Sequence, residues 1–113
     1  MQCKKYIPEA GDIVWINSDH TQGHEQRGRR PAVVITPREY NELSGLVICC
    51  LMTRQVKGYP FEVMLAKDSV VLVDQVRTLD WNARECKKDS SIDPSKLEEV
   101  RTKLGLVAGI TQG

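Results

Sequence analysis

Short apolar runs follow one another closely in the first 80 residues, and they constrain the fold more than any other feature of this chain. Each run is rich in Val, Ile and Leu and is bounded by Gly, Pro or Asp, which is the pattern expected of β-strands. The sequence predicts strands at residues 13–16, 31–36, 46–53, 61–65, 70–73 and 76–79. So many short strands in so little chain predict a mainly β protein built as a small barrel.

The run at residues 46–53 is apolar at nearly every position, which is typical of a strand covered on both faces. We therefore expect it to be central in the sheet, with Cys49 and Cys50 as small buried hydrophobic residues. Residues 54–60 contain Gly, Pro and basic side chains. We expect them to form the basic loop of a hairpin that leads into the half-exposed strand 61–65.

Two helices are expected beside the strands. Pro37 suits the first turn of a short helix, and Ser44 with Gly45 can end it. Near the end of the chain, Asp93 can cap a helix that has Pro94 at its first position. One face of this C-terminal helix should pack on the barrel through the apolar residues that recur at helical spacing, Leu97, Val100, Leu104 and Val107.

Length and charge narrow the class of protein. The 113 residues fit one domain, residues 1–113, and the net charge of +1 excludes a binder that acts through bulk positive charge. No apolar segment approaches the roughly 18 residues of a membrane span and no signal segment is visible, so we expect a soluble, cytoplasmic protein. The four cysteines include no Cys-x-x-Cys pair, so we expect reduced thiols and no structural metal site.

Positive charge is concentrated in the polar loop between the first two strands. Residues 23–31 hold Arg27, Arg29 and Arg30 together with the carboxylate of Glu25. A guanidinium offers a planar fork of donors that suits phosphate oxygens, and the glycines of this loop allow close approach of a ligand. Composition alone favours a solvated charged loop, in which Glu25 is an ion-pair partner.

Thr53, at the end of the central strand, marks a second candidate region. It is followed by Arg54, Lys57 and Tyr59. A hydroxyl at a strand end is usually a local hydrogen-bonding group. If the two loops converge, however, arginines, a lysine, a hydroxyl, a carboxylate and an aromatic ring surround one groove that could hold single-stranded RNA.

Four segments then resemble a known family in their order and spacing. The segments GDIVW, GHEQRGRRPAVVIT, TRQVKGYPFEV and VLVDQVRTLDWNAR resemble the MazF/PemK family of toxin endoribonucleases from bacterial toxin–antitoxin pairs, from about Tyr6 to the C-terminal helix. The resemblance implies an SH3-like barrel with added helices and a homodimer. It also implies cleavage of single-stranded RNA, usually mRNA, without a metal or other cofactor, and inhibition by a cognate antitoxin.

The resemblance also implies which residues act. The family's active-site arginine falls on Arg30, its threonine or serine on Thr53, and its loop glutamate on Glu25. Two positions depart from the family pattern: Leu51 replaces a common proline, and Arg54 replaces a small polar residue. The cleavage sequence should therefore not be inherited from a relative. The residues expected to bind RNA are Gln26, Arg27, Arg29, Arg54, Gln55, Lys57 and Tyr59.

The implied reaction is attack of the RNA 2′-hydroxyl on the adjacent phosphorus, which leaves a 2′,3′-cyclic phosphate and a 5′-hydroxyl. Arg30 would stabilise negative charge and Thr53 would donate a hydrogen bond to the phosphate. Because arginine stays cationic at neutral pH, Glu25 is chemically the better base, with His24 as a further possibility.

Two other functions remain open. A toxin of this barrel type that poisons a protein such as DNA gyrase depends on an aromatic residue near the C-terminus, whereas this chain ends LVAGITQG. A barrel that binds RNA without cutting it would be separated from a nuclease by incubation with labelled RNA and chelator.

Overall fold

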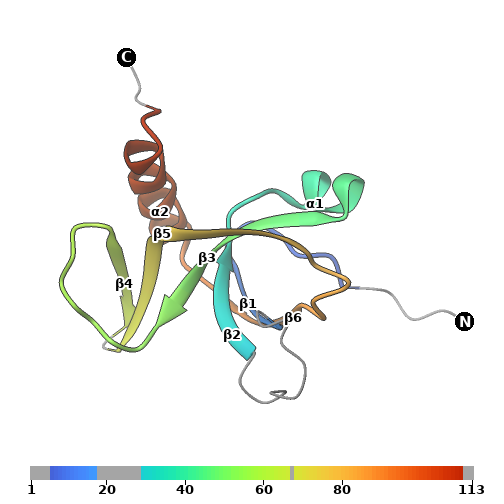
Figure 1. The fold of residues 1–113 in the computed structure, drawn as a ribbon, viewed down its shortest axis with the longest axis horizontal. Coiled ribbons are helices and arrows are strands. Elements are labelled where there is room, and N and C mark those ends of the chain that lie inside the picture. The colour runs from blue at the N-terminus through green and yellow to red at the C-terminus, as the bar shows by residue number, and fades with distance from the viewer. Residues whose placement is uncertain (1–5, 18–28, 67, 111–113) are drawn as a thin grey trace, which may run out of the picture.

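A computed structural model describes residues 6–17, 29–66 and 68–110 of the chain. These ranges contain six strands and two helices, arranged around one curled sheet (Figure 1). In chain order the elements are β1 (Asp12–Asn17), β2 (Arg29–Val34), α1 (Arg38–Ser44), β3 (Leu46–Thr53), β4 (Glu62–Ala66), β5 (Ser69–Asp80), β6 (Lys87–Ser91) and α2 (Pro94–Val107).

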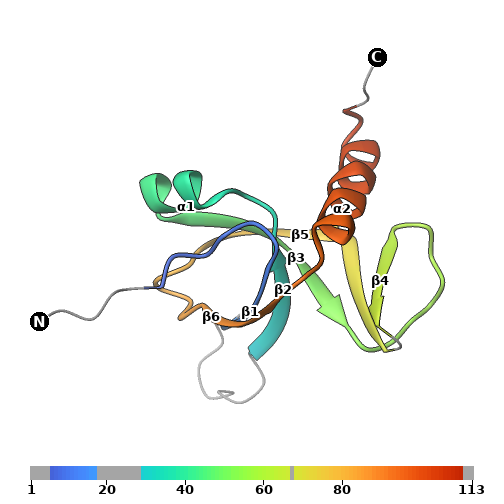
Figure 2. The ribbon, with the colours of Figure 1, turned by 180° about the vertical axis from the view of Figure 1, so that it is seen from behind.

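The strands pair antiparallel in the order β4-β5-β3-β2-β1-β6. The expected mainly β fold with a C-terminal helix is therefore confirmed, in the form of a strongly curled, barrel-like sheet (Figure 1). The bounds of β3 are those expected, and its place between β5 and β2 confirms that it is central. α1 and α2 lie at opposite ends of the sheet (Figure 2).

The prediction of a hairpin between β3 and β4 is wrong, because β5 lies between these two strands in the sheet. The hairpin is instead formed by β4 and β5, in which Val63 pairs with Val71. The basic loop 54–61 therefore crosses from the centre of the sheet to its edge. β4 has one neighbour in the described sheet, and its alternation of buried and exposed side chains suits that edge position.

The two strands expected at residues 70–73 and 76–79 are one strand of 12 residues, β5. Asp74 and Gln75 do not end it, because the pairing with β3 jumps from Met52↔Val71 to Cys50↔Val76. Asp74 and Gln75 are exposed at this irregularity whereas Val73 stays buried, so the strand continues with its polar side chains in solvent.

Apolar side chains cover both faces of the sheet. Val14, Val34 and Leu51 belong to a cluster on one face, and Val33 and Val71 belong to a cluster on the other. α2 covers the second face through Leu97, Val100 and Leu104, as expected, whereas Val107 remains 40% exposed.

Cys49 and Cys50 are fully buried, one in each cluster, which confirms their expected role as small core residues. Burial raises the pKa of Cys49 to about 12 and that of Cys50 to about 11. Both thiols are therefore protonated and unreactive at neutral pH.

α1 begins one residue later than expected, because Pro37 is its N-cap rather than part of its first turn. Gly45 ends the helix with φ +75°, a backbone conformation that glycine adopts without strain. Asn41 of this helix is fully buried, where its Nδ2 donates to Pro8 O at 2.7 Å and its backbone carbonyl accepts from Trp81 Nε1 at 2.8 Å. α1 thus ties the N-terminal segment to the end of β5.

Candidate nucleic-acid interface

A groove of about 510 Å³ opens where β2 begins and β3 ends. The antiparallel pairing of Ala32 with Leu51 places these two strand ends side by side. The sequence regions that were expected to converge therefore do so within the described residues. The groove is lined by Ile13, Trp15, Arg29, Arg30, Pro31, Met52, Thr53, Arg54, Ser69, Asp89 and Ser90.

Arg30 lines this groove. Its side chain is half-buried, and its Nη2 donates a long hydrogen bond of 3.5 Å to Met52 O, the carbonyl that precedes Thr53. A guanidinium has five N–H donors, so this weak contact leaves it the capacity to bind an anion. The pairing of β2 with β3 thus places a positive charge in the same groove as the Thr53 hydroxyl.

Thr53 is the last residue of β3, and a local contact orients its hydroxyl. The backbone N–H of Gln55 donates to Thr53 Oγ1 at 3.2 Å. Because the oxygen accepts this bond, the hydroxyl hydrogen can be donated to a ligand. The Thr53 hydroxyl can therefore accept the bond from Gln55 and donate a hydrogen bond to a phosphate at the same time.

A second, smaller groove of about 240 Å³ adjoins the first, and Thr53 lines both grooves. Gln55, Lys57 and Tyr59 line it together with Glu62. The Glu62 carboxylate accepts from the backbone N–H groups of Gly58, at 3.0 Å, and of Lys57, at 3.4 Å. Glu62 therefore fixes the loop that carries the expected RNA-binding side chains.

Three expected site residues, Glu25, Gln26 and Arg27, lie outside the described residues, as does His24. The other expected residues fall into two sets. Arg29, Arg30, Thr53 and Arg54 share the larger groove, and Thr53, Gln55, Lys57 and Tyr59 share the smaller one.

The sequence reasoning missed one wall of the larger groove, formed by Trp15, Asp89 and Ser90. Strand alternation could have identified Trp15, because it lies between the inward-facing Val14 and Ile16 and so faces the other side. The strand β6 has no such signal, since its sequence KKDSS is polar and exposed throughout.

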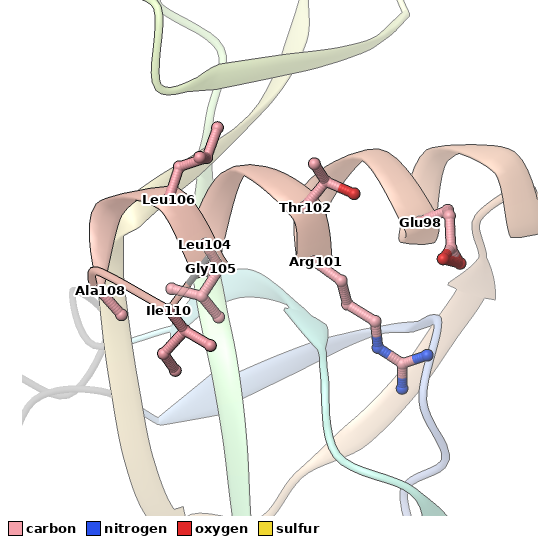
Figure 3. A pocket seen from close by; sticks show the side chains of 8 residues that line it. All are labelled: Glu98, Arg101, Thr102, Leu104, Gly105, Leu106, Ala108 and Ile110. Atoms are coloured by element: carbon pink, nitrogen blue, oxygen red, sulfur yellow. The ribbon is translucent and has the colours of Figure 1, made fainter. Parts of the chain in front are cut away.

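A larger apolar cavity of about 770 Å³ lies along α2 and contains none of the expected site residues (Figure 3). Its lining includes Leu104, Leu106, Ile110 and Arg101, whose Nη2 donates to Ile35 O at 2.8 Å. Its lining includes one arginine, Arg101, and one hydroxyl, Thr102, but it does not share a residue with the groove that holds Arg30 and Thr53.

Two further features bear on the class of site. Within the described ranges, no three His, Cys, Asp or Glu side chains lie close enough to hold a metal ion. Neither α1 nor α2 has the length and apolar character needed to cross a membrane.

Comparisons with known proteins agree along almost the whole chain. The family model described as PemK-like, MazF-like toxin of type II toxin-antitoxin system matches residues 9–108. The endoribonuclease toxin MazF of Escherichia coli (strain K12) is 42% identical over 108 residues, which cover 93% of this chain and 97% of that protein. The endoribonuclease toxin ChpB of the same strain is 33% identical over 113 residues, which cover 92% of this chain and 97% of that protein.

A solved structure gives the same relationship at the level of the fold. A chain in the crystal structure of MazE-MazF (Form-III) from Deinococcus radiodurans matches with a TM-score of 0.85 and 42% identity, covering 94% of this chain and 100% of that chain. With the family model matching most of the sequence, this chain belongs to the PemK-like, MazF-like toxin family of type II toxin-antitoxin systems.

Proposed function

We propose that this protein is the endoribonuclease toxin of a toxin–antitoxin pair and that it cleaves single-stranded RNA, mRNA above all, in the cytoplasm. One observation carries the proposal: the Arg30 guanidinium and the Thr53 hydroxyl line the same groove, flanked by Arg29 and Arg54. Relatives that cover nearly the whole chain are endoribonuclease toxins, which supports the same activity here.

The proposed reaction needs three groups from the protein: one that stabilises negative charge, a base and an acid. The 2′-oxygen attacks the adjacent phosphorus, the bond to the 5′-oxygen breaks, and a cyclic phosphate and a 5′-hydroxyl result. Arg30 stabilises the negative charge on the non-bridging oxygens, because its planar fork can bind two of them and it stays cationic. Thr53 donates its hydroxyl hydrogen to the same phosphate, in the orientation set by the N–H of Gln55.

A base must accept the 2′-proton, and an acid must protonate the departing 5′-oxygen. We assign the base role to Glu25, since a carboxylate accepts protons at neutral pH and a guanidinium does not. The assignment rests on the position of Glu25 in the sequence GHEQRGRRPAVV, next to the strand that carries Arg30.

The proposed partner is a cognate antitoxin with an acidic, flexible tail that competes with RNA. The solved relative is a complex of MazF with MazE, which supports such a partner for this chain. Arg29, Arg54 and Lys57 are exposed beside the two grooves and offer the tail complementary charge. We further propose that the active form is a homodimer.

The test is to incubate purified protein with a mixed RNA pool in the presence of a chelator and to map new 5′-hydroxyl ends. We expect cuts at a short recurring sequence, with cyclic phosphates on the upstream fragments. The variant Arg30→Ala in the same pool is the control for a contaminating nuclease. Retention of RNA without any new ends would instead identify a binding protein.

A further inference from the structure

The unpredicted wall of the larger groove is built by a β-bulge in β6. In the pairing with β1, Ile13 lies opposite Ser90 and Val14 opposite Lys88, so Asp89 has no partner of its own. A bulge of this kind places two consecutive side chains on the same face of a sheet. Asp89 and Ser90 therefore both line the groove, next to Trp15.

The strand on either side of the bulge shows that this placement is specific. Lys88 turns to the opposite face, where its Nζ lies 3.6 Å from Oδ1 of the buried Asp12. That ion pair and the pairing of Lys87 with Trp15 fix the register before the bulge. The carboxylate of Asp89 is thus directed to the groove by the backbone.

Hydrogen bonds tie the wall into one unit. Trp15 Nε1 donates to Asp89 Oδ1 at 3.4 Å, and Ser90 Oγ donates to Asp89 Oδ2 at 2.9 Å. The Trp15 side chain is 37% exposed, so part of the indole is available to a ligand. Each carboxylate oxygen has two lone pairs, so Asp89 can still accept hydrogen bonds.

The two sides of the groove carry opposite charges. Arg29, Arg30 and Arg54 come from the ends of β2 and β3, whereas Asp89 comes from β6. β3 and β6 are separated by three strand spacings of about 4.8 Å, on the order of 14 Å along the sheet. A phosphate is attracted to the arginine side and repelled by the Asp89 carboxylate, so the acidic wall does not suit the RNA backbone.

An unpaired base suits the acidic wall well. Proteins read single-stranded RNA by stacking bases on aromatic rings and by hydrogen bonding to the exposed base edges. Trp15 provides a ring, and Asp89 provides a group that only accepts hydrogen bonds. Adenine, cytosine and guanine carry an amino group that donates, whereas uracil has carbonyl oxygens on both sides of its single N–H donor.

We propose that Trp15, Asp89 and Ser90 form a base-recognition subsite that selects an amino-bearing base over uracil at one position near the cleaved bond. The inference rests on the proposed ribonuclease function and adds a determinant of its sequence specificity. The positive side of the groove then holds the phosphate while the acidic side holds the base, which fixes the direction of the strand.

The first test is the cleavage profile of a randomised RNA pool. For the wild type we expect uracil to be depleted at one position near the cut. Asp89→Asn replaces one acceptor oxygen by a donor amide at nearly constant shape, and it should admit uracil at that position, with discrimination reduced about tenfold. Glu42→Gln, the same chemical change on exposed α1, should leave the profile unchanged. A wild-type profile for Asp89→Asn would overturn the proposal.

Two comparisons separate stacking from hydrogen bonding. Trp15→Phe keeps an aromatic ring but loses the bond to Asp89, so it should retain more affinity than Trp15→Ala. Deletion of the amino group from the selected base, as purine riboside for adenosine or inosine for guanosine, should slow cleavage by the wild type but not by Asp89→Asn. This substrate change does not depend on the folding of a variant, and equal rates for the wild type would contradict the subsite.

Binding of uncleavable RNA separates failure of this inference from failure of the proposed function. We would measure the anisotropy of labelled 2′-O-methyl heptamers of A, C and U. Tighter binding of the A and C heptamers than of the U heptamer, lost in Asp89→Asn, supports the subsite even if the protein cuts nothing. Equal binding of all three, or no binding, overturns it.

Discussion

Arg30 combines a positive charge with a planar fork of donors, and its function can be tested by removing both or the fork alone. Arg30→Ala should lower the cleavage rate by about 10²–10³-fold, because one strong donor to the transition-state oxygens is lost. Arg30→Lys keeps the charge without the fork and should fall between Ala and wild type. Circular dichroism would verify the fold, and a folded Arg30→Ala that cuts at the wild-type rate would refute the assignment.

Thr53 tests whether a hydroxyl or a shape is needed at the end of β3. Thr53→Ser retains the oxygen that accepts from the Gln55 N–H, so it should keep much of the activity. Thr53→Ala removes that oxygen and should lower the rate strongly. The rates of both variants should be compared under single-turnover conditions. Equal loss in the two variants would indicate a packing role for the methyl group instead.

Glu25 is tested by the pH dependence of the rate. If its carboxylate is the base, the rate rises with pH as the carboxylate loses its proton, which gives the profile an acidic limb. Glu25→Gln cannot titrate, so that limb should disappear and the remaining rate should be low. An acidic limb that persists unchanged in Glu25→Gln would assign the base to another group.

The sequence identified individual site residues where their side chains contrast with the apolar residues around them. A threonine and basic side chains directly after an apolar strand pointed to Thr53 and Arg54, and strand pairing then placed Arg30 beside them. Asp89 could not have been found in this way, because its position depends on a bulge in a polar strand whose pairing leaves no pattern in the sequence.

Among the elements, α1 depends on one buried polar side chain. The Asn41 amide donates to Pro8 O and Thr36 O, and its oxygen accepts from the Thr36 hydroxyl. Asn41→Ala should lower the free energy of unfolding by about 2–4 kcal/mol, because buried carbonyls and a hydroxyl lose their partners. Chemical denaturation would measure the change. Glu42→Ala, on the exposed side of the same helix, should change it by less than about 0.5 kcal/mol.

The sequence predicted the helices and strands that have a strong local pattern, but it did not predict which strands pair with each other. The all-apolar run fixed β3 to its bounds, and the glycine and proline signals located α1 and the start of α2. The partner of β4 could not be inferred, because chain order favours β3 whereas the longer β5 pairs with both. β6 has a polar sequence and is held by backbone bonds to β1, so apolar periodicity could not predict it.

The net charge of the whole molecule is close to zero, but positive charge is concentrated in one region. The net charge is +1, yet exposed basic side chains gather at the ends of β2 and β3 and in the loop that follows. Such a local concentration of charge favours binding of an anionic chain in one region over general binding of polyanions. An acidic antitoxin tail and an RNA strand would compete for the same charges, although their chemistry differs.

Arg54 and Lys57 together test whether RNA and the antitoxin bind the same charges. Replacing both with glutamine should weaken the binding of single-stranded RNA and of the cognate antitoxin, and should make both less dependent on salt. Loss of two phosphate contacts should reduce the slope of log K against log salt for RNA by about 1.4. Arg38→Gln with Lys96→Gln gives the same net charge away from the grooves and should change neither slope by as much. Titrations at low and moderate salt would measure both ligands, and a wild-type antitoxin slope alongside collapsed RNA binding would show that the two do not share this surface.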